Sequence, residues 1–217
     1  KKNKTIFEKP DFVIGVSNKV LEGINNNSKV ISHWWNPKLL KFQKKSHKYA
    51  IAIGSLEKIK GFDLLISAWK NLNTKLLIIG SGQEKRNLKA LIEMNKLSEK
   101  VKIIENVKKD ELLKFYEDAS VLIVSSRDDS GPRVALEALF LEIPVLSTNV
   151  GQMENILPEE LLAKKNDQES LRALLEKYVD DIDILNQEAI FDFIKGEYSI
   201  DKKINEINLI YDSLLIR

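Results

Sequence analysis

The stretch that decides the fold runs from Val121 to Leu139 and reads VLIVSSRDDSGPRVALEAL. Its first four residues, 121–124, form an apolar run of strand length without polar alternation, which is typical of a strand buried on both faces. A polar, acidic loop follows, and Pro132 suits the first turn of a helix. Apolar residues then recur at helical spacing. The stretch therefore predicts a buried strand, a polar loop and a helix, in that order.

The same alternation of apolar runs and amphipathic segments covers the middle of the chain. Apolar runs of strand length lie at 49–53, 76–79, 101–104 and 144–146. Between the strands, apolar side chains recur at helical spacing over 62–69, 88–92, 112–119 and 134–139. Strands that alternate with helices in this way predict an α/β fold: a doubly wound parallel sheet, covered by helices on both faces, with right-handed crossovers.

The two ends of the chain differ from the middle. Residues 12–16 predict a strand, with Ser17 as the N-cap of a helix, and 29–31 predict another short strand. Residues 38–48 are rich in lysine and are interpreted as a linker. After Leu162 the pattern becomes helical over 170–178, 182–193 and 200–215, with a break at Gly196.

Composition excludes several classes of function. The chain has 217 residues with a formal net charge of +2, which argues against general nucleic-acid binding. It has no cysteine, so disulfides, thiolate catalysis and cysteine-ligated zinc are excluded. The two histidines, His33 and His47, lie outside any metal-ligand spacing, so we expect no metal site. No apolar stretch approaches membrane-spanning length and no signal peptide is evident, so we expect a cytoplasmic protein.

Ligands of an open parallel sheet bind beyond the carboxyl ends of its strands, so the loops that follow the strands are expected to hold the ligand-binding residues. Gly54 and Ser55 follow the strand at 49–53, and Lys60 and Gly61 precede a helix, where free amides and the helix dipole favour an anion. Lys60 could add a charge-assisted contact to a phosphate. The alternative is a turn with one solvated lysine. The sequence 80–82, Gly-Ser-Gly, lacks the rest of a dinucleotide-binding pattern and is interpreted as a tight turn.

The loop and helix after 121–124 carry two carboxylates. Asp129 lies in the loop and Glu137 about two turns further on. Carboxylates accept hydrogen bonds from vicinal hydroxyl groups, such as those of sugars, so the pair could bracket a ligand. The alternatives are that Asp129 is an acid favoured by the helix dipole and that Glu137 is a surface glutamate.

Taken in order, these segments resemble the C-terminal domain of the retaining glycosyltransferases of family 4, which have the two-domain GT-B fold with Rossmann-like halves. The resemblance runs from about Phe12 to the C-terminus. Asp129 and Glu137, with seven residues between them, match the spacing of the family's two signature glutamates. Other matches are Gly54-Ser55-Leu56 with Lys60-Gly61, Glu111-Leu112 with Tyr116 and Ala119, Pro144 to Thr148, and a final helix at 199–215.

The resemblance implies a role for each matched position. Asp129 and Lys60 would be the catalytic residues, with Asp129 at the donor sugar and Lys60 at the diphosphate, and Glu137 would bind the ribose. The remaining donor-binding positions implied are Gly54, Ser55, Asn106, Val107, Gly131, Arg133 and Val134, with the backbone of 106–107 near the base. The donor would be a UDP- or GDP-hexose, and neither a cofactor nor a metal would be required. The hexose would be transferred with retention to a glycan or lipid-linked acceptor in polysaccharide biosynthesis.

Four positions depart from the family pattern. Ser55 replaces an arginine, Glu142 and Glu105 replace glycines, and Asp129 replaces the first glutamate. These departures leave open an alternative function, a non-catalytic nucleotide-sugar-binding module. A receiver-like signalling domain is disfavoured, because the strand at 49–53 is not followed by a cluster of acidic residues.

Domain boundaries also follow from the resemblance. Residues 1–37 would be the remnant of an N-terminal acceptor domain, 38–48 the linker, 49–195 the nucleotide-sugar-binding domain and 196–217 a C-terminal crossing helix. We therefore expect part of a longer enzyme, with the missing N-terminal domain as its partner. The resemblance admits peripheral contact of the full-length enzyme with the inner membrane face, and a dimer formed through an exposed final helix. Trp34 and Trp35 either stack on a sugar or base or pack against the linker or the missing domain.

Overall fold

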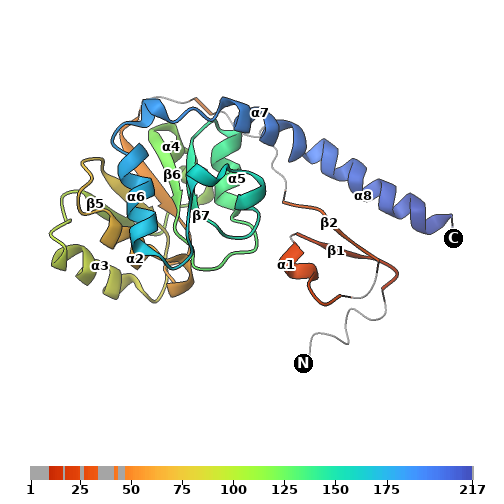
Figure 1. Ribbon diagram of the computed structural model, residues 1–217, viewed down its shortest axis with the longest axis horizontal. Helices are drawn as coiled ribbons and strands as arrows, with labels where there is room; N and C mark the ends of the chain where they lie inside the picture. The colour runs from red at the N-terminus through yellow and green to blue at the C-terminus, as the bar shows by residue number, and fades with distance from the viewer. Residues whose placement is uncertain (1–9, 17, 25–26, 34–41, 44–46, 217) are drawn as a thin grey trace.

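The computed structural model describes residues 10–16, 18–24, 27–33, 42–43 and 47–216. Its centre is a six-stranded sheet in which every neighbouring pair is parallel, in the order β5-β4-β3-β6-β7-β8 (Figure 1). The strands are β3 (Tyr49–Ile53), β4 (Leu76–Ile79), β5 (Val101–Ile104), β6 (Ala119–Val124), β7 (Val145–Thr148) and β8 (Leu162–Ala163). The predicted doubly wound α/β fold is confirmed.

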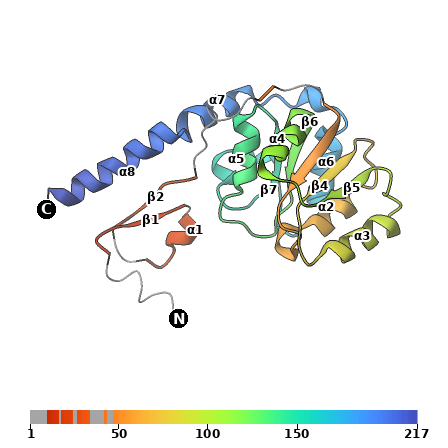
Figure 2. The same cartoon turned by 180° about the vertical axis from the view of Figure 1, so that it is seen from behind.

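Helices cover both faces of this sheet (Figures 1 and 2). The helices after β3 and β4, together with the helix after β8, lie on one face, and those before and after β6 lie on the other. The first group is α2 (Phe62–Ala68), α3 (Lys85–Met94) and α6 (Gln168–Tyr178), and the second is α4 (Lys109–Glu117) and α5 (Arg133–Phe140). The central strand β6 is therefore buried at all its positions, which is why its residues 121–124 read as one apolar run.

The chain reverses direction across the sheet between β3 and β6. It builds outward from β3 to β5, returns through α4, and then builds outward on the other side from β6 to β8. The carboxyl ends of β3 and β6 therefore flank the topological switch point, where open α/β sheets bind their ligands.

Glycines allow the loops beyond this edge to touch. Gly61 has a left-handed backbone with φ of 64°, and a Cβ there would lie 2.1 Å from the carbonyl oxygen of Ser125. At Gly80, φ is 156° and a Cβ would lie 1.8 Å from the carbonyl oxygen of Gly54. No other residue fits at either position without moving the backbone. The Gly-Ser-Gly segment at 80–82 thus packs against the loop after β3. The turn predicted there begins only at Gly82, whose carbonyl accepts a hydrogen bond from the amide of Lys85.

A small second unit precedes the sheet. β1 (Val13–Gly15) and β2 (Ser28–Val30) form a two-stranded parallel sheet with α1 (Asn18–Leu21). This unit lies below α8 (Ile200–Leu215), which projects away from the six-stranded sheet (Figure 1). The side-chain amide of Gln152 donates a hydrogen bond to the carbonyl of Val16, which ties the small unit to the loop after β7.

Three predictions for the C-terminal third were wrong. The short edge strand β8 was missed, and the predicted helix at 182–193 is a 3-10 turn (Ile182–Ile184) followed by α7 (Glu188–Glu197). Gly196 lies inside α7, and the break comes at Ser199, whose hydroxyl accepts a hydrogen bond from the amide of Lys202 and caps α8. A hydroxyl cap, and not glycine, separates the last two helices.

Two further expectations are outside or only partly inside the described residues. Trp34, Trp35 and most of the predicted linker at 38–48 lie outside them. In the described part of the chain, every helix is too short or too polar to cross a bilayer.

Candidate functional site

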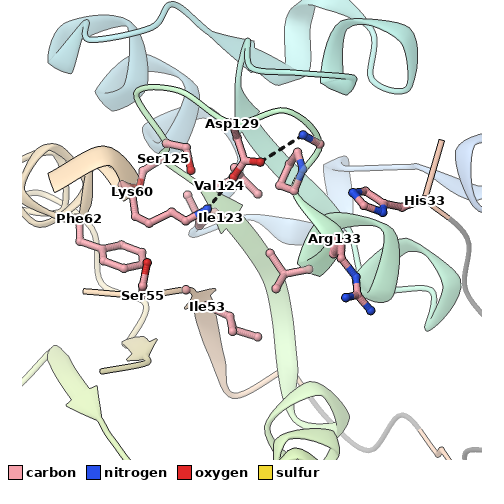
Figure 3. Close-up of a pocket in the computed structure, with 15 residues that line it drawn as sticks. His33, Ile53, Ser55, Lys60, Phe62, Ile123, Val124, Ser125, Asp129 and Arg133 are labelled. Carbon is pink, nitrogen blue, oxygen red and sulfur yellow. Dashed lines mark hydrogen bonds and ion pairs between the residues drawn. The ribbon is translucent and has the colours of Figure 1, made fainter. Parts of the chain in front are cut away.

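A cavity of about 340 Å³ lies at the switch point (Figure 3). It is bounded by the ends of β3 and β6, by the 3-10 turn η3 (Lys58–Lys60) and by the start of α5. Seven of the ten predicted donor-binding residues line it: Gly54, Ser55, Lys60, Asp129, Gly131, Arg133 and Val134. Residues that lie far apart in the sequence therefore converge on one cavity.

Lys60 and Asp129, the two residues predicted to be catalytic, form an ion pair in this cavity. Lys60 Nζ lies 2.6 Å from Asp129 Oδ2, and the two side chains are 28% and 12% exposed. The other carboxylate oxygen of Asp129 accepts a hydrogen bond from the backbone amide of Gly131, at 3.1 Å. The carboxylate is thus fixed between a cation and a backbone amide.

The loop after β6 holds the turn that carries Lys60. The hydroxyl of Ser125 donates to the carbonyl oxygen of Lys60 at 2.9 Å, and the amide of Arg127 donates to the carbonyl of Ile59 at 2.7 Å. These contacts fix the backbone on both sides of the Lys60–Asp129 pair, so the pair does not depend on side-chain conformation alone.

Arg127 extends the same connection to α2. Its guanidinium donates to both oxygens of Asp63, each at 2.7 Å, and to the carbonyl of Lys58 at 2.6 Å. Burial alone would raise the pKa of Asp63, but the hydrogen bonds and charge of Arg127 hold that pKa below its usual value. Arg127 does not line the cavity. Arg127 therefore does not supply the charge that Ser55 lacks, and Lys60 and Arg133 are the cationic side chains among the described residues that line the cavity.

The start of α5 presents free amides to the cavity. Among the described residues, the amides of Arg133 and Val134 donate to no group, and both residues line the cavity. Pro132, which has no amide hydrogen, occupies the N-cap. First-turn amides and the helix dipole together favour an anion at this position.

His33 also lines the cavity, and the sequence pattern did not point to it. It follows β2 and lies beside Arg133, outside the six-stranded sheet (Figure 3). Burial and the charge of Arg133 lower its pKa, and the carboxylate of Asp129 opposes them. The imidazole is therefore neutral at pH 7, with no hydrogen-bond partner in the described ranges. No local sequence pattern identifies a residue that reaches the cavity from the small unit before the six-stranded sheet.

The other three predicted residues lie outside the lining of the cavity. Glu137 accepts a hydrogen bond from the hydroxyl of Tyr116 at 3.2 Å. Burial, with Glu137 beside it, raises the pKa of Tyr116 well above its usual value, so the hydroxyl keeps its proton. Asn106 is exposed in a left-handed conformation and Val107 packs against the core, both after β5. The two carboxylates predicted to bracket a ligand are thus separated, with Asp129 in the cavity and Glu137 further along α5.

Three of the residues that depart from the family pattern lie in different surroundings in the structure. Ser55 lines the cavity and leaves it with one cation fewer. Glu142 lies just beyond the C-terminal end of α5, has a left-handed backbone with φ of 56° and pairs with Lys195. Glu142 therefore lies away from the cavity, which is at the other end of α5. Glu105, after β5, pairs with Lys85.

The described residues contain no group of three or more His, Asp or Glu side chains that could hold a metal ion. That donor binding needs no metal stays a prediction.

Known proteins share both the sequence pattern and the fold. Residues 38–189 match the family described as glycosyl transferases group 1. A glycosyltransferase of Methanocaldococcus jannaschii is 26% identical over 178 residues, which is 81% of this chain and 48% of that protein. The amylovoran biosynthesis glycosyltransferase AmsD of Erwinia amylovora is 32% identical over 109 residues, 49% of this chain and 30% of that protein.

Solved structures agree with this assignment of the fold. HepE from Anabaena, determined in complex with UDP and glucose, superposes with a TM-score of 0.81 at 14% identity, over 94% of this chain and 63% of that one. The fold is that of the GT-B glycosyltransferases. The chain spans about half the length of the M. jannaschii relative. The family match covers most of the chain and includes every strand of the central sheet, so this protein belongs to the glycosyl transferases group 1 family.

Proposed function

We propose that the cavity at the switch point binds the diphosphate and sugar of a UDP- or GDP-hexose, and that this domain is the donor-binding half of a hexosyltransferase. The observation that carries the proposal is the Lys60–Asp129 ion pair of 2.6 Å, which faces the free amides of α5 across one cavity. One side of the cavity thus suits an anion and the other suits hydroxyl groups.

The diphosphate would lie against the positive groups of the cavity. Lys60 and Arg133 supply charge, and the amides of Arg133 and Val134 supply directed hydrogen bonds. The carboxylate of Asp129 repels phosphate but accepts hydrogen bonds from sugar hydroxyls. It is therefore assigned to the hexose, with Lys60 between the two parts of the donor.

The nucleoside would extend out of the cavity along α5. Glu137, held by Tyr116, would accept hydrogen bonds from the ribose hydroxyls, and the backbone of 106–107 would lie near the base. HepE, which shares the fold, was solved with UDP and glucose, and this supports a nucleotide sugar as the ligand class.

The transfer itself would proceed on one face of the sugar. The bond from the anomeric carbon to the diphosphate breaks, a bond to the acceptor oxygen forms on the same side, and the acceptor proton passes to the leaving diphosphate oxygen. Lys60, Arg133 and the amides of α5 would stabilise the negative charge that develops on the diphosphate. Fixed positive charge would do the work of a metal ion in this scheme.

The acceptor is assigned to a glycan or a lipid-linked sugar. AmsD, which is similar to 49% of this chain, is named for amylovoran biosynthesis, and this supports a role in building a polysaccharide. Most acceptor contacts would come from the rest of the enzyme, so we expect this chain to bind donor but to transfer sugar very slowly on its own.

A non-catalytic nucleotide-sugar-binding module is the second candidate. Ser55 favours it, because a hydroxyl that donates to Glu57 stands where the family has an arginine. A turnover assay separates the two functions. If the full-length protein binds the donor but neither transfers nor hydrolyses the sugar, it is a binding module.

Calorimetric titration of the chain with UDP, GDP, ADP and their hexose conjugates tests the proposal. We expect one nucleotide series to bind, and Glu137→Ala to weaken that binding at least tenfold, because a carboxylate that accepts two hydroxyl groups is lost. A folded chain that binds none of these compounds would overturn it.

A further inference from the structure

A second cleft, separate from the donor cavity, lies where the small N-terminal unit meets the loop after β7 and the start of α8. Its volume is about 310 Å³, at the lower end of the range of small-molecule sites, which is roughly 300–1,000 Å³. Polar side chains from four separate segments form much of its wall: Asn18, Ser32, Gln152, Asn155, Tyr198 and Lys203.

Two buried residues of this cleft carry hydroxyl groups that have no hydrogen-bond partner among the described residues. Ser32 is 7% exposed and Tyr198 is 8% exposed, and neither hydroxyl makes a hydrogen bond to any described residue. Buried polar groups are nearly always hydrogen-bonded, since leaving one unpaired costs about 1–3 kcal/mol. A pair of such groups in one cleft indicates that a ligand or ordered water supplies their partners.

The aromatic ring of Tyr198 is held in place, which leaves its hydroxyl as the group available to a ligand. Phe193 meets the ring edge-on at a centroid distance of 6.1 Å, and Lys203 Nζ lies 5.4 Å from the ring centroid. Neighbours on two sides therefore fix the direction of the hydroxyl, as a specific binding site requires.

The charges of the described residues at the cleft balance, which favours a neutral ligand. Lys203 is 7% exposed and pairs with Glu206 at 2.9 Å. Of the other two charged residues that line the cleft, Lys165 and Glu154, one is positive and one negative. A phosphate or a carboxylate gains nothing here, whereas a molecule with many hydroxyl groups can both donate to and accept from the hydroxyls and amides of the wall.

One layer of backbone separates this cleft from the donor cavity. Gly151 packs so closely that a Cβ there would lie 2.8 Å from the backbone nitrogen of Gly131, which lines the donor cavity. A Cβ at Gly131 would likewise lie 3.7 Å from the amide of Gln152, which lines the second cleft. Ser32 and His33, adjacent in sequence, line one site each. A ligand in the second cleft is thus close to the bound donor.

We infer that the second cleft binds a neutral sugar residue of the acceptor glycan. The assignment of this sugar to the acceptor rests on the proposed transferase function. The assignment of the cleft as a sugar site rests on the unpaired hydroxyls and the balanced charge. It assigns to Tyr198 and Ser32 the hydrogen bonds that orient this sugar.

Saturation-transfer NMR on the 217-residue chain tests the inference with methyl glycosides of glucose, galactose, mannose and N-acetylglucosamine as probes. At least one glycoside should bind, and Tyr198→Phe and Ser32→Ala should each weaken its binding about three- to tenfold, the effect of one hydrogen bond. Tyr178→Phe, at another buried tyrosine on α6, is the matched control and should leave glycoside binding unchanged. Melting curves check that every variant folds.

Donor titrations keep this test separate from the test of the proposed function. Lys60→Ala should weaken nucleotide-sugar binding and leave glycoside binding unchanged, whereas Tyr198→Phe should weaken glycoside binding and leave nucleotide-sugar binding unchanged. Glycoside binding without any nucleotide binding would refute the donor proposal alone. If no glycoside binds, or if glycoside binding is lost with Lys60→Ala and unchanged in both cleft variants, the second cleft is not a sugar site.

Discussion

The guanidinium of Arg127 holds the carboxylate of Asp63 through both terminal nitrogens, each 2.7 Å from one oxygen. Asp63 belongs to α2 and Arg127 to the loop after β6, so the pair fastens together the two segments that supply Lys60 and Asp129. The ion pair that faces the ligand is therefore supported by a second ion pair behind it.

Arg127→Ala should destabilise the fold by about 1–3 kcal/mol, because the Asp63 carboxylate loses its charged partner and the carbonyl of Lys58 loses the guanidinium donor. Arg127→Lys keeps the charge but cannot donate to both carboxylate oxygens at once. Its stability should therefore lie between that of Arg127→Ala and that of the wild type. Denaturant unfolding at neutral pH measures both. Equal stability of Arg127→Ala and the wild type would contradict the clamp.

The Asp63 contribution to stability should depend on pH in a defined direction. The pKa of Asp63 is lower in the folded protein than its reference value of 3.8, so its stabilisation is complete above that pH and lost as pH falls through the folded value. The difference in unfolding free energy between wild type and Arg127→Ala should therefore shrink below pH 3.8. A difference that is constant down to pH 2 would show that the arginine acts without this carboxylate.

Gly61→Ala should cost more than about 3 kcal/mol of stability, because its Cβ collides with the carbonyl of Ser125 and its backbone is left-handed. Gly196→Ala is the opposite case: it lies inside α7, and a Cβ there meets nothing within 4 Å. That variant should gain up to roughly 1 kcal/mol from helix propensity. Thermal melting of the two variants should thus move in opposite directions, and a shared direction would count against the close approach at Gly61.

Donor binding should tighten as pH falls from 7.5 to 5.5. His33 is neutral in the free protein because burial and Arg133 lower its pKa, while Asp129 acts in the other direction. A bound diphosphate favours the protonated ring, so binding takes up a proton, and affinity rises tenfold for each unit by which the pKa is raised. Titrations with a nucleotide sugar, whose diphosphate does not titrate in this range, measure the effect.

His33→Gln should remove this pH dependence, and His47→Gln, on the opposite edge of the sheet near Lys48, should not. A wild-type affinity that does not change over this pH range would mean that the diphosphate lies away from His33.

Tyr116→Phe should weaken nucleotide binding about two- to tenfold, since Glu137 loses the hydroxyl that orients it. The effect should fall on nucleosides and nucleotide sugars alike, because Glu137 is assigned to the ribose. Inorganic diphosphate, which has no ribose, should bind the variant and the wild type equally. An equal loss for diphosphate would place Glu137 in a general structural role.

Much of this fold was predictable because its strands are buried on both faces. Most core strands contain a short apolar run, such as LLII in β4 and VLIV in β6, and the helices between the strands carry apolar residues at helical spacing. β8 has only two residues at the edge of the sheet and gives no such signal. The break before α8 was misplaced because glycine is a weak helix breaker, whereas Ser199 caps the helix by a hydrogen bond.

The candidate site was predictable only where its residues follow strands. Lys60 and Asp129 belong to loops at one edge of a parallel sheet, so topology alone brings them together. The pairing of Arg127 with Asp63 and the position of His33 in the cavity depend on tertiary packing between segments that no sequence pattern links. The second cleft has the same origin, since it is formed by segments more than 100 positions apart, such as Ser32 and Tyr198.

The most direct test of the donor cavity uses the nucleotide sugar that binds the wild type. It is titrated into Lys60→Ala, with Lys58→Ala as the control. Both lysines belong to η3, but only Lys60 lines the cavity. We expect Lys60→Ala to weaken binding at least tenfold, because one charge-assisted contact is lost and Asp129 is left facing the diphosphate. Lys58→Ala should bind as the wild type does. Equal affinities in all three proteins would contradict the assignment of this cavity as the donor site.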